Sequence, residues 1–349
     1  MGKNRSLALD VIRIFACLCI LIIHFNASVC GWEATGGFTY PNQLLPNNIL
    51  GNVYLGDFGV GIFFILSGAC LQITSKFESL NFRNIIYFYK RRALSIYPCY
   101  WIAFLFATLI SFLWYKGMSL AKVSNFFISL CGIDGYLGFM IKKGGDFYQI
   151  GEWFLGCIII IYLLFPLISY SFNKKPILSS LFWVGLHLYL VNIMSKNWFF
   201  LCIPYFLLGM FFIKYCKTAK NLLLLLSTLV VISFRILFSE YIPYPTVIII
   251  TCWGTFVFLH LITEILEKRF LVLRKEFLKK NIAYISVLTY PAFLIHHKLI
   301  IILASLFNLT NFPYRYTIML FLCYMIILIY LAVKLEKATN YLVLKLKNI

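Results

Sequence analysis

Three titratable side chains interrupt the first long apolar run of the sequence. Residues 7–25 read LALDVIRIFACLCILIIHF, in which Asp10, Arg13 and His24 stand among otherwise uncharged residues. A charged side chain in a lipid-spanning helix is energetically costly, so such residues usually face a cavity or a substrate pathway. An imidazole has an ordinary pKa near neutrality, so it can exchange protons at physiological pH. The run therefore combines a candidate proton acceptor with a carboxylate and a guanidinium.

Helical spacing places two of these side chains on one face. Arg13 and His24 are 11 residues apart, which corresponds to a rotation of roughly 20° past three full turns and a separation of about 16 Å along the axis. Asp10, three residues before Arg13, is close enough to pair with it. A structural ion pair and a packed, hydrogen-bonded histidine are the alternative interpretation. Three ionisable groups on one helix favour a functional site.

Histidines also occur in a late apolar run, which reads SVLTYPAFLIHHKLI and contains His296 and His297 beside Lys298. Pro291 interrupts this run and frees backbone groups that must find other partners. The run is either a kinked packing helix or a second source of site residues. Arg235, near the outer end of another run, either reaches the membrane interface or lines an outward pocket for a polar substrate.

Aromatic and basic residues alternate in FRNIIYFYKRRALSIYP, residues 82–98, just before the third long apolar run. One interpretation is an amphipathic helix that lies at the membrane interface. The other is a cytoplasmic phosphate-binding patch, for which arginine is suited because its planar fork binds two oxygens at once.

The composition indicates that a membrane positions these side chains. Of 349 residues, 62% are hydrophobic and 12% are charged, and the mean hydropathy is +0.88. Soluble domains are far more polar. The predicted fold class is therefore all-α, a polytopic transmembrane helical bundle that forms a single membrane domain over residues 1–349, with no soluble domain. The 11 cysteines show no metal-binding spacing, so no metal is expected.

About ten apolar runs approach the roughly 20 residues that a helix needs to cross the hydrocarbon core. The expected spans are residues 7–28, 53–74, 96–114, 151–173, 177–194, 198–215, 221–239, 244–265, 282–304 and 315–336.

The distribution of basic residues predicts the orientation of these spans. With the N-terminus in the cytoplasm, inside segments carry 22 Lys and Arg and outside segments carry 6, in agreement with the positive-inside rule. An even number of spans then places both termini in the cytoplasm. The net charge of +19 reflects these loops, and no nucleic-acid partner is expected.

Five segments resemble, in the same order, the motifs of one family of membrane enzymes. They are RSLALDVIRIFACLCILIIHF, GVGIFFILSGACL, FYKRRALSIYPCYW, WFLGCIIIIYLLFP and TYPAFLIHHKLI. The first resembles the hallmark of the acyltransferase-3 family, an Arg, ten residues and a His, with an acidic residue before the Arg. Many members have a Glu five residues after the fourth-helix Trp, whereas this chain has Ile158. A role for that Glu cannot be transferred.

The resemblance implies an enzyme that transfers an acyl group, usually acetyl from acetyl-CoA, to a hydroxyl of a cell-envelope glycan. The expected activity is that of an O-acetyltransferase in a bacterial inner membrane, in contact with membrane lipids. Its acceptor would be a lipid-linked oligosaccharide or a growing polysaccharide such as O-antigen or capsule. The acyl donor, acetyl-CoA, would be a co-substrate from the cytoplasm.

The resemblance also suggests roles for the candidate residues. His24 would be the general base that takes the proton of the acceptor hydroxyl, with an acyl-histidine intermediate as the alternative. The expected catalytic residues are His24, Arg13 and Asp10, and the expected donor-binding residues are Arg91, Arg92 and Arg83. Residues expected to bind substrate or stabilise the oxyanion are Ser67, Trp153, Tyr290 and His296.

Transport is the competing class of function. A multi-pass transporter or flippase for a glycan or small polar molecule would also carry charges within its spans. The sequence shows no inverted repeat of the kind that many transporters have. Transfer of labelled acetyl to a glycan would indicate the enzyme, and flux without acyl chemistry would indicate the carrier.

Overall fold

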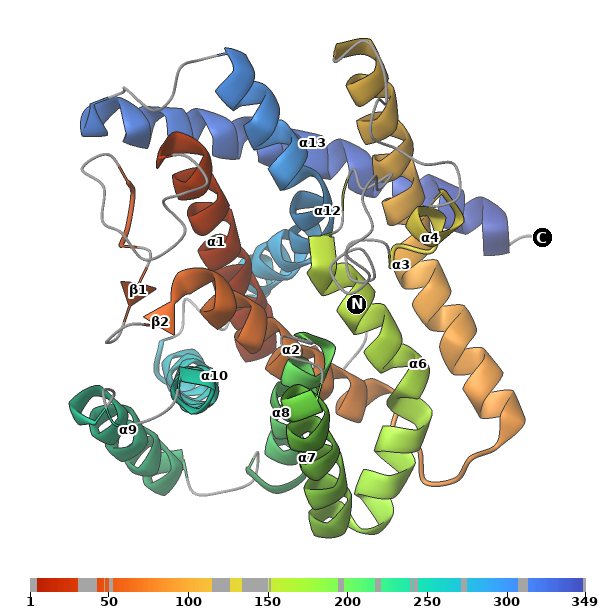
Figure 1. The fold of residues 1–349 in the computed structure, drawn as a ribbon, viewed down its shortest axis with the longest axis vertical. Coiled ribbons are helices and arrows are strands. Elements are labelled where there is room, and N and C mark those ends of the chain that lie inside the picture. Colours follow the sequence, from red (N-terminus) through yellow and green to blue (C-terminus); the bar gives the residue numbers. More distant parts are fainter. Residues whose placement is uncertain are drawn as a thin grey trace. The chain divides into compact units, whose positions relative to one another are not determined.

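The protein is built almost entirely of helices, as Figure 1 shows. The computed structural model describes residues 5–30, 43–46, 48–49, 53–114, 126–133, 150, 152–193, 198–216, 221–238, 241, 244–270, 275–306 and 313–347. Its elements are α1 (Leu7–Cys30), β1 (Asn48–Ile49), β2 (Val53–Tyr54), α2 (Leu55–Thr74), α3 (Phe82–Trp114), α4 (Phe126–Leu130), α6 (Glu152–Lys174), α7 (Pro176–Ile193), α8 (Trp198–Phe211), the π-helical turn η3 (Phe212–Cys216), α9 (Asn221–Leu237), α10 (Tyr244–Arg269), α12 (Glu276–Leu306) and α13 (Tyr314–Lys347). The predicted all-α, polytopic fold class is confirmed.

Seven helices in the described part of the chain are long and apolar enough to cross a membrane: α1, α2, α3, α6, α10, α12 and α13. The spans expected at 177–194, 198–215 and 221–239 coincide with shorter apolar helices, Pro176–Leu186, Cys202–Cys216 and Thr228–Leu237. The protein is therefore a multi-pass membrane protein. The count of ten spans and the cytoplasmic placement of both termini stay predictions.

Helix α3 is longer than the span expected at 96–114. It has 33 residues and begins at Phe82, so it measures about 50 Å, compared with about 30 Å for the hydrocarbon core. The aromatic and basic segment therefore continues the same helix as the third span. Its excess length is enough to carry the basic residues out of the hydrocarbon region.

Contacts group the chain into two compact units. Unit 1 contains Met1–Thr74, Pro204–Thr289 and Ile300–Tyr324, and unit 2 contains Ser75–Ile203, Tyr290–Leu299 and Met325–Ile349. In unit 1, α1, α2 and α10 pack against one another, and α9 packs on α10. In unit 2, α6 packs against α3 and α7. Figure 1 shows α6 and α7 as a helical hairpin.

Two glycines allow α2 and α8 to approach closely within unit 1. A Cβ atom added to Gly68 would lie 1.9 Å from the carbonyl oxygen of Phe206, and one added to Gly209 would lie 1.8 Å from that of Ile65. Small residues at helix crossings are a general means of association in membranes, where apolar side chains gain little from leaving lipid. The Ser-Gly pair of the second motif thus includes a packing glycine.

Aromatic side chains of α3 hold the short helix α4 in unit 2. Tyr97 and Tyr100 donate hydrogen bonds to the carbonyls of Cys131 and Ser129, and the indole of Trp101 donates to that of Leu130 at 2.9 Å. These carbonyls lie at and just after the end of α4, where the helical hydrogen-bond pattern stops; that of Ser129 also accepts a hydrogen bond from the amide of Gly132. Residues 126–133 are thereby fixed against the middle of α3.

Candidate functional site

Asp10 is clamped at the start of α1. Its carboxylate accepts two hydrogen bonds from the fork of Arg5, Nε to Oδ2 at 2.7 Å and Nη2 to Oδ1 at 2.8 Å. It also accepts one from the Ser286 hydroxyl of α12 at 2.7 Å. Arg5 donates further to the carbonyl of Ala283. Because Asp10 is only 5% exposed, these three bonds replace its hydration and join the start of α1 to α12 within unit 1.

Arg13 forms the expected ion pair with Asp10, but it is the weaker of two partners because Arg5 makes the shorter contacts. Arg13 Nη1 lies 3.9 Å from Asp10 Oδ1, which is beyond hydrogen-bond distance. It donates instead to Ser286 Oγ at 3.3 Å and, through Nη2, contacts the sulfur of Cys70 at 3.4 Å. Arg5, which precedes the helix, reaches the carboxylate with better geometry. The Arg13 guanidinium is therefore only loosely held and keeps donors for a ligand.

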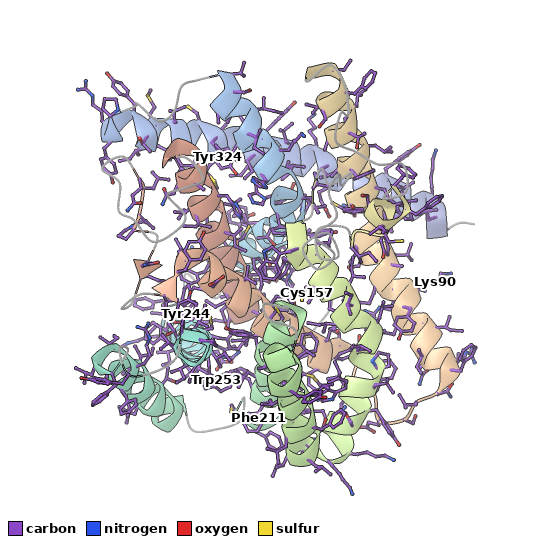
Figure 2. The ribbon with its side chains drawn as sticks, viewed as in Figure 1. Lys90, Cys157, Phe211, Tyr244, Trp253 and Tyr324 are labelled. Atoms are coloured by element: carbon purple, nitrogen blue, oxygen red, sulfur yellow. The ribbon has the colours of Figure 1, made fainter. Side chains whose placement is uncertain are left out.

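His24 lies near the other end of α1, where the chain around it is fixed. It is half-buried. Two residues later, the fully buried Asn26 accepts a hydrogen bond from the Leu44 amide at 3.0 Å and donates one to the Leu45 carbonyl at 2.9 Å. The neighbouring Phe25 packs against Tyr324, which Figure 2 labels. These contacts set the position of the helix end that carries the imidazole.

Ser67 is half-buried on α2 of the same unit, one residue before the packing glycine Gly68. Contacts of α1 with α2 pair Arg13 with Cys70 near the end of α2, and Ile20 with Gly59 near its start. The two helices therefore run antiparallel.

The basic residues of α3 belong to unit 2 and differ in accessibility. Arg83 and Arg91 are exposed, as is Lys90, which Figure 2 shows projecting from α3. The Arg91 guanidinium lies over the ring of Tyr87 at 5.7 Å. These exposed guanidiniums can reach a phosphate without displacing another group.

Arg92 has a more internal position. Its guanidinium lies over the Phe88 ring at 5.8 Å and over the Tyr162 ring of α6 at 6.0 Å. Its Nε is buried and donates to no acceptor among the described residues. Because cation–π contacts stabilise such a placement, Arg92 has a structural role in joining α3 to α6 as well as its expected role in donor binding.

Tyr290 and His296 of α12 are both held by backbone carbonyls in unit 2. The Tyr290 hydroxyl donates to the carbonyl of Ile96 at 3.2 Å. His296 is fully buried, and its Nδ1 lies 2.5 Å from the carbonyl of Phe293. Beside them, Lys298 donates to the hydroxyl of Ser111. The Tyr290 proton is therefore directed to the backbone rather than to a substrate oxygen.

Trp153 is half-buried in the first turn of α6, and its neighbour Phe154 contacts Phe293 of α12 edge-on at 5.3 Å. The structure thus brings the expected site residues together in two groups. Asp10, Arg13, His24 and Ser67 belong to unit 1, and Arg83, Arg91, Arg92, Trp153, Tyr290 and His296 belong to unit 2.

Sequence reasoning missed three contributors to the polar cluster at the start of α1. Arg5 carries a signal, since it is a basic residue about one and a half helical turns before an acid, but it precedes the apolar run. Ser286 and Cys70 carry none, because each is a small residue in an apolar run. Within the described residues, no group of three His, Cys, Asp or Glu side chains could hold a metal ion.

The chain matches the family model of acyltransferase-3, described as an acyltransferase domain, over residues 6–335. The protein belongs to the acyltransferase-3 family. As a member of this family it is a membrane acyltransferase, which requires an acyl donor and an acceptor. No curated protein and no solved structure matches the chain.

Proposed function

We propose that this acyltransferase transfers an acetyl group from cytoplasmic acetyl-CoA to a hydroxyl of a cell-envelope glycan in a bacterial inner membrane. A lipid-linked oligosaccharide or a polysaccharide such as O-antigen or capsule would be the acceptor. The observation that carries the proposal is the arrangement of α1, where Arg13 and His24 share one face. Arg5 makes the short contacts of Asp10, and the contacts of Arg13 are longer, so Arg13 has donor capacity for a ligand.

The proposed orientation has ten spans in one membrane domain over residues 1–349, with both termini in the cytoplasm. The excess of Lys and Arg in the segments assigned to the inside supports it. Seven long helices and three shorter apolar ones in the described residues account for the ten segments. In this orientation Arg13 lies toward the cytoplasm and His24 lies about 16 Å farther across the membrane.

The donor would bind from the cytoplasm through its phosphates. Arg83 and Arg91 are exposed on the part of α3 that extends beyond a bilayer thickness. A guanidinium binds phosphate oxygens in pairs, which favours these residues and Arg92 as donor ligands. Arg13 would act nearer to the reacting end of the donor.

His24 would act as the general base. Its neutral imidazole takes the proton of the acceptor hydroxyl while that oxygen attacks the thioester carbonyl. The carbon–sulfur bond then breaks, and the imidazolium returns the proton to the CoA thiolate. The neutral imidazole is the form that accepts this proton, and the ordinary pKa of a histidine near neutrality allows that form at physiological pH.

The oxyanion that forms in this step needs a hydrogen-bond donor. Ser67 belongs to the same unit as His24 and carries a half-buried hydroxyl. Ser67 lies eight residues past Gly59, on the Arg13 side of the point where α1 and α2 cross. It is therefore roughly 18 Å or more from His24 along the helix axes, so we propose it as a substrate contact near Arg13 rather than as the oxyanion donor. The Tyr290 hydroxyl donates to Ile96, and His296 Nδ1 faces the carbonyl of Phe293. Trp153 is proposed as a substrate contact.

The test is the transfer of labelled acetyl from acetyl-CoA to glycan by His24→Ala. Loss of a general base should lower turnover by about 100-fold or more while membrane insertion is retained. His260→Gln is the matched control. That imidazole packs against Phe212 at 4.8 Å and lies 3.9 Å from Glu264, so its loss should change stability but not turnover per folded molecule. Near-normal turnover by a well-folded His24→Ala protein would contradict the assignment.

A further inference from the structure

A polar side-chain pair joins α2 to α10 in unit 1, away from the cluster at the start of α1. The hydroxyl of Tyr244 donates to Oδ2 of Asp57 at 2.9 Å. The same hydroxyl oxygen accepts a hydrogen bond from the backbone amide of Tyr54 at 3.3 Å. Tyr244 lies in the first turn of α10 and is labelled in Figure 2. The carboxylate is thus held in a fixed orientation through a chain of two hydrogen bonds.

Asp57 and His24 lie on the same side of the point where α1 and α2 cross. A Cβ atom on Gly59 would meet Ile20, Ala16 and Cys19, so α1 and α2 cross at this level. From these three contacts on α1, His24 is four to eight residues, or about 6–12 Å, farther along the helix, and Asp57 is two residues, or about 3 Å, from Gly59 toward the start of α2. Because the helices are antiparallel, both displacements have the same direction. Packed helix axes are typically about 8–10 Å apart.

The Asp57 carboxylate retains capacity to bind a ligand. Within the described residues, Oδ2 has the Tyr244 partner and Oδ1 accepts no hydrogen bond, although the residue is only half-exposed. A carboxylate in a membrane-spanning helix is costly and usually functional. The partial positive charge at the N-terminus of α2 lowers the cost of placing the Asp57 carboxylate there. This stabilisation does not need the Tyr244 hydrogen bond that orients the carboxylate.

A buried cation contributes to the electrostatics around this pair. Arg235 of α9 is 1% exposed and is close enough to Tyr244 for their charges to interact. The oxygens of the Asp57 carboxyl group can accept hydrogen bonds, and each hydroxyl of a sugar can donate one.

The geometry points to Asp57, oriented by Tyr244, as a residue that binds the hydroxyl groups of the acceptor sugar beside His24. This inference rests on the proposed function and names the acceptor end of the same reaction. It assigns the outer end of α2 and α10 to acceptor recognition and leaves the basic residues of α3 to the donor. Asp57 would determine which sugar hydroxyl pattern is accepted.

The experiment measures acetyl transfer by the full-length protein in lipid nanodiscs. The donor is radiolabelled acetyl-CoA, and the acceptor probe is the glycan extracted from membranes of a strain that lacks the protein. Asp57→Asn should raise the KM for this extract about tenfold, the loss expected for a charged hydrogen-bond acceptor. The KM for acetyl-CoA and the kcat should stay within about twofold, since the carboxylate does not touch the donor. Tyr244→Phe, which only releases the carboxylate, should raise the KM for the extract about threefold.

Glu336→Gln is the matched control. Glu336 is another half-buried carboxylate held by a single side chain, the amide of Asn340 at 3.1 Å, and its replacement should leave the KM for the extract unchanged. A fall in kcat with an unchanged KM for the extract in Asp57→Asn would overturn the inference, as would an equal effect in Glu336→Gln. If Asp57→Asn does not fold, Tyr244→Phe decides by the same criterion.

A second readout separates this inference from the proposed function. The extract should raise the melting temperature of the wild-type protein and should fail to do so for Asp57→Asn. If the wild-type protein transfers no acetyl but shows this shift, the proposed chemistry is wrong and the binding role of Asp57 is kept. If the extract shifts both proteins equally, the binding role is wrong.

Discussion

Replacement of the two arginines near Asp10 should separate stability from activity. Arg5→Ala removes the two hydrogen bonds, 2.7 and 2.8 Å long, that the guanidinium donates to the Asp10 carboxylate. The carboxylate is only 5% exposed and keeps the Ser286 hydrogen bond as its one remaining short contact among the described residues. A hydrogen bond to a charged group contributes about 1.5–3 kcal/mol. The Arg5 side chain is 35% accessible, so solvent screening reduces this contribution. We expect the free energy of unfolding to fall by about 2–3 kcal/mol.

Arg13→Ala should have the opposite profile. Its contact with Asp10 is 3.9 Å long, and its other contacts are a 3.3 Å hydrogen bond and a 3.4 Å approach to sulfur. Such contacts are at the weak end of hydrogen-bond geometry. We expect a loss of less than about 1 kcal/mol in stability, together with at least a tenfold loss in acetyl transfer because the donor path loses its cation.

The assay combines reversible unfolding in mixed detergent micelles with acetyl transfer per folded molecule. Lys280→Ala is the control for loss of a basic side chain, since its pair with Glu276 is 3.4 Å long and largely exposed, and its effect should be within about 0.5 kcal/mol. The reasoning is refuted if Arg13→Ala destabilises the protein as much as Arg5→Ala does. It is equally refuted if Arg13→Ala is stable and fully active.

Two other predictions test the helix packing and the donor patch. Gly68→Ala should lower the free energy of unfolding by about 1–3 kcal/mol, since its Cβ would lie 1.9 Å from a backbone oxygen of α8. The control is Gly185→Ala in α7, where an added Cβ would have no atom within 4 Å, so this change should be neutral or slightly stabilising. Arg91→Ala should raise the KM for acetyl-CoA without a change in melting temperature, whereas Arg92→Ala should raise the KM and lower the melting temperature, because only Arg92 lies over rings of both α3 and α6. A lower melting temperature for Arg91→Ala, or equal effects on donor and glycan KM, would show that the patch is not a donor site.

Features that depend on local spacing were predictable from the sequence. The apolar runs became helices, and the all-α membrane fold and the acyltransferase-3 family are both confirmed. The shared face of Arg13 and His24 follows from helical periodicity alone. Each of these properties is encoded within one segment, so no knowledge of the other segments is needed.

Only the tertiary structure decided which polar groups meet. Asp10 makes its short contacts with Arg5 and Ser286 and only a 3.9 Å ion pair with Arg13, and Ser286 is 276 residues away. The Asp57–Tyr244 pair joins residues 187 apart, and neither was a candidate. The physical reason is that these helices are surrounded by lipid rather than by water. Lipid is as apolar as most of their side chains, so burial gives no periodic pattern that marks which faces pack together. Close approach at glycines and the pairing of scarce polar groups select the partners, and both depend on how the helices cross.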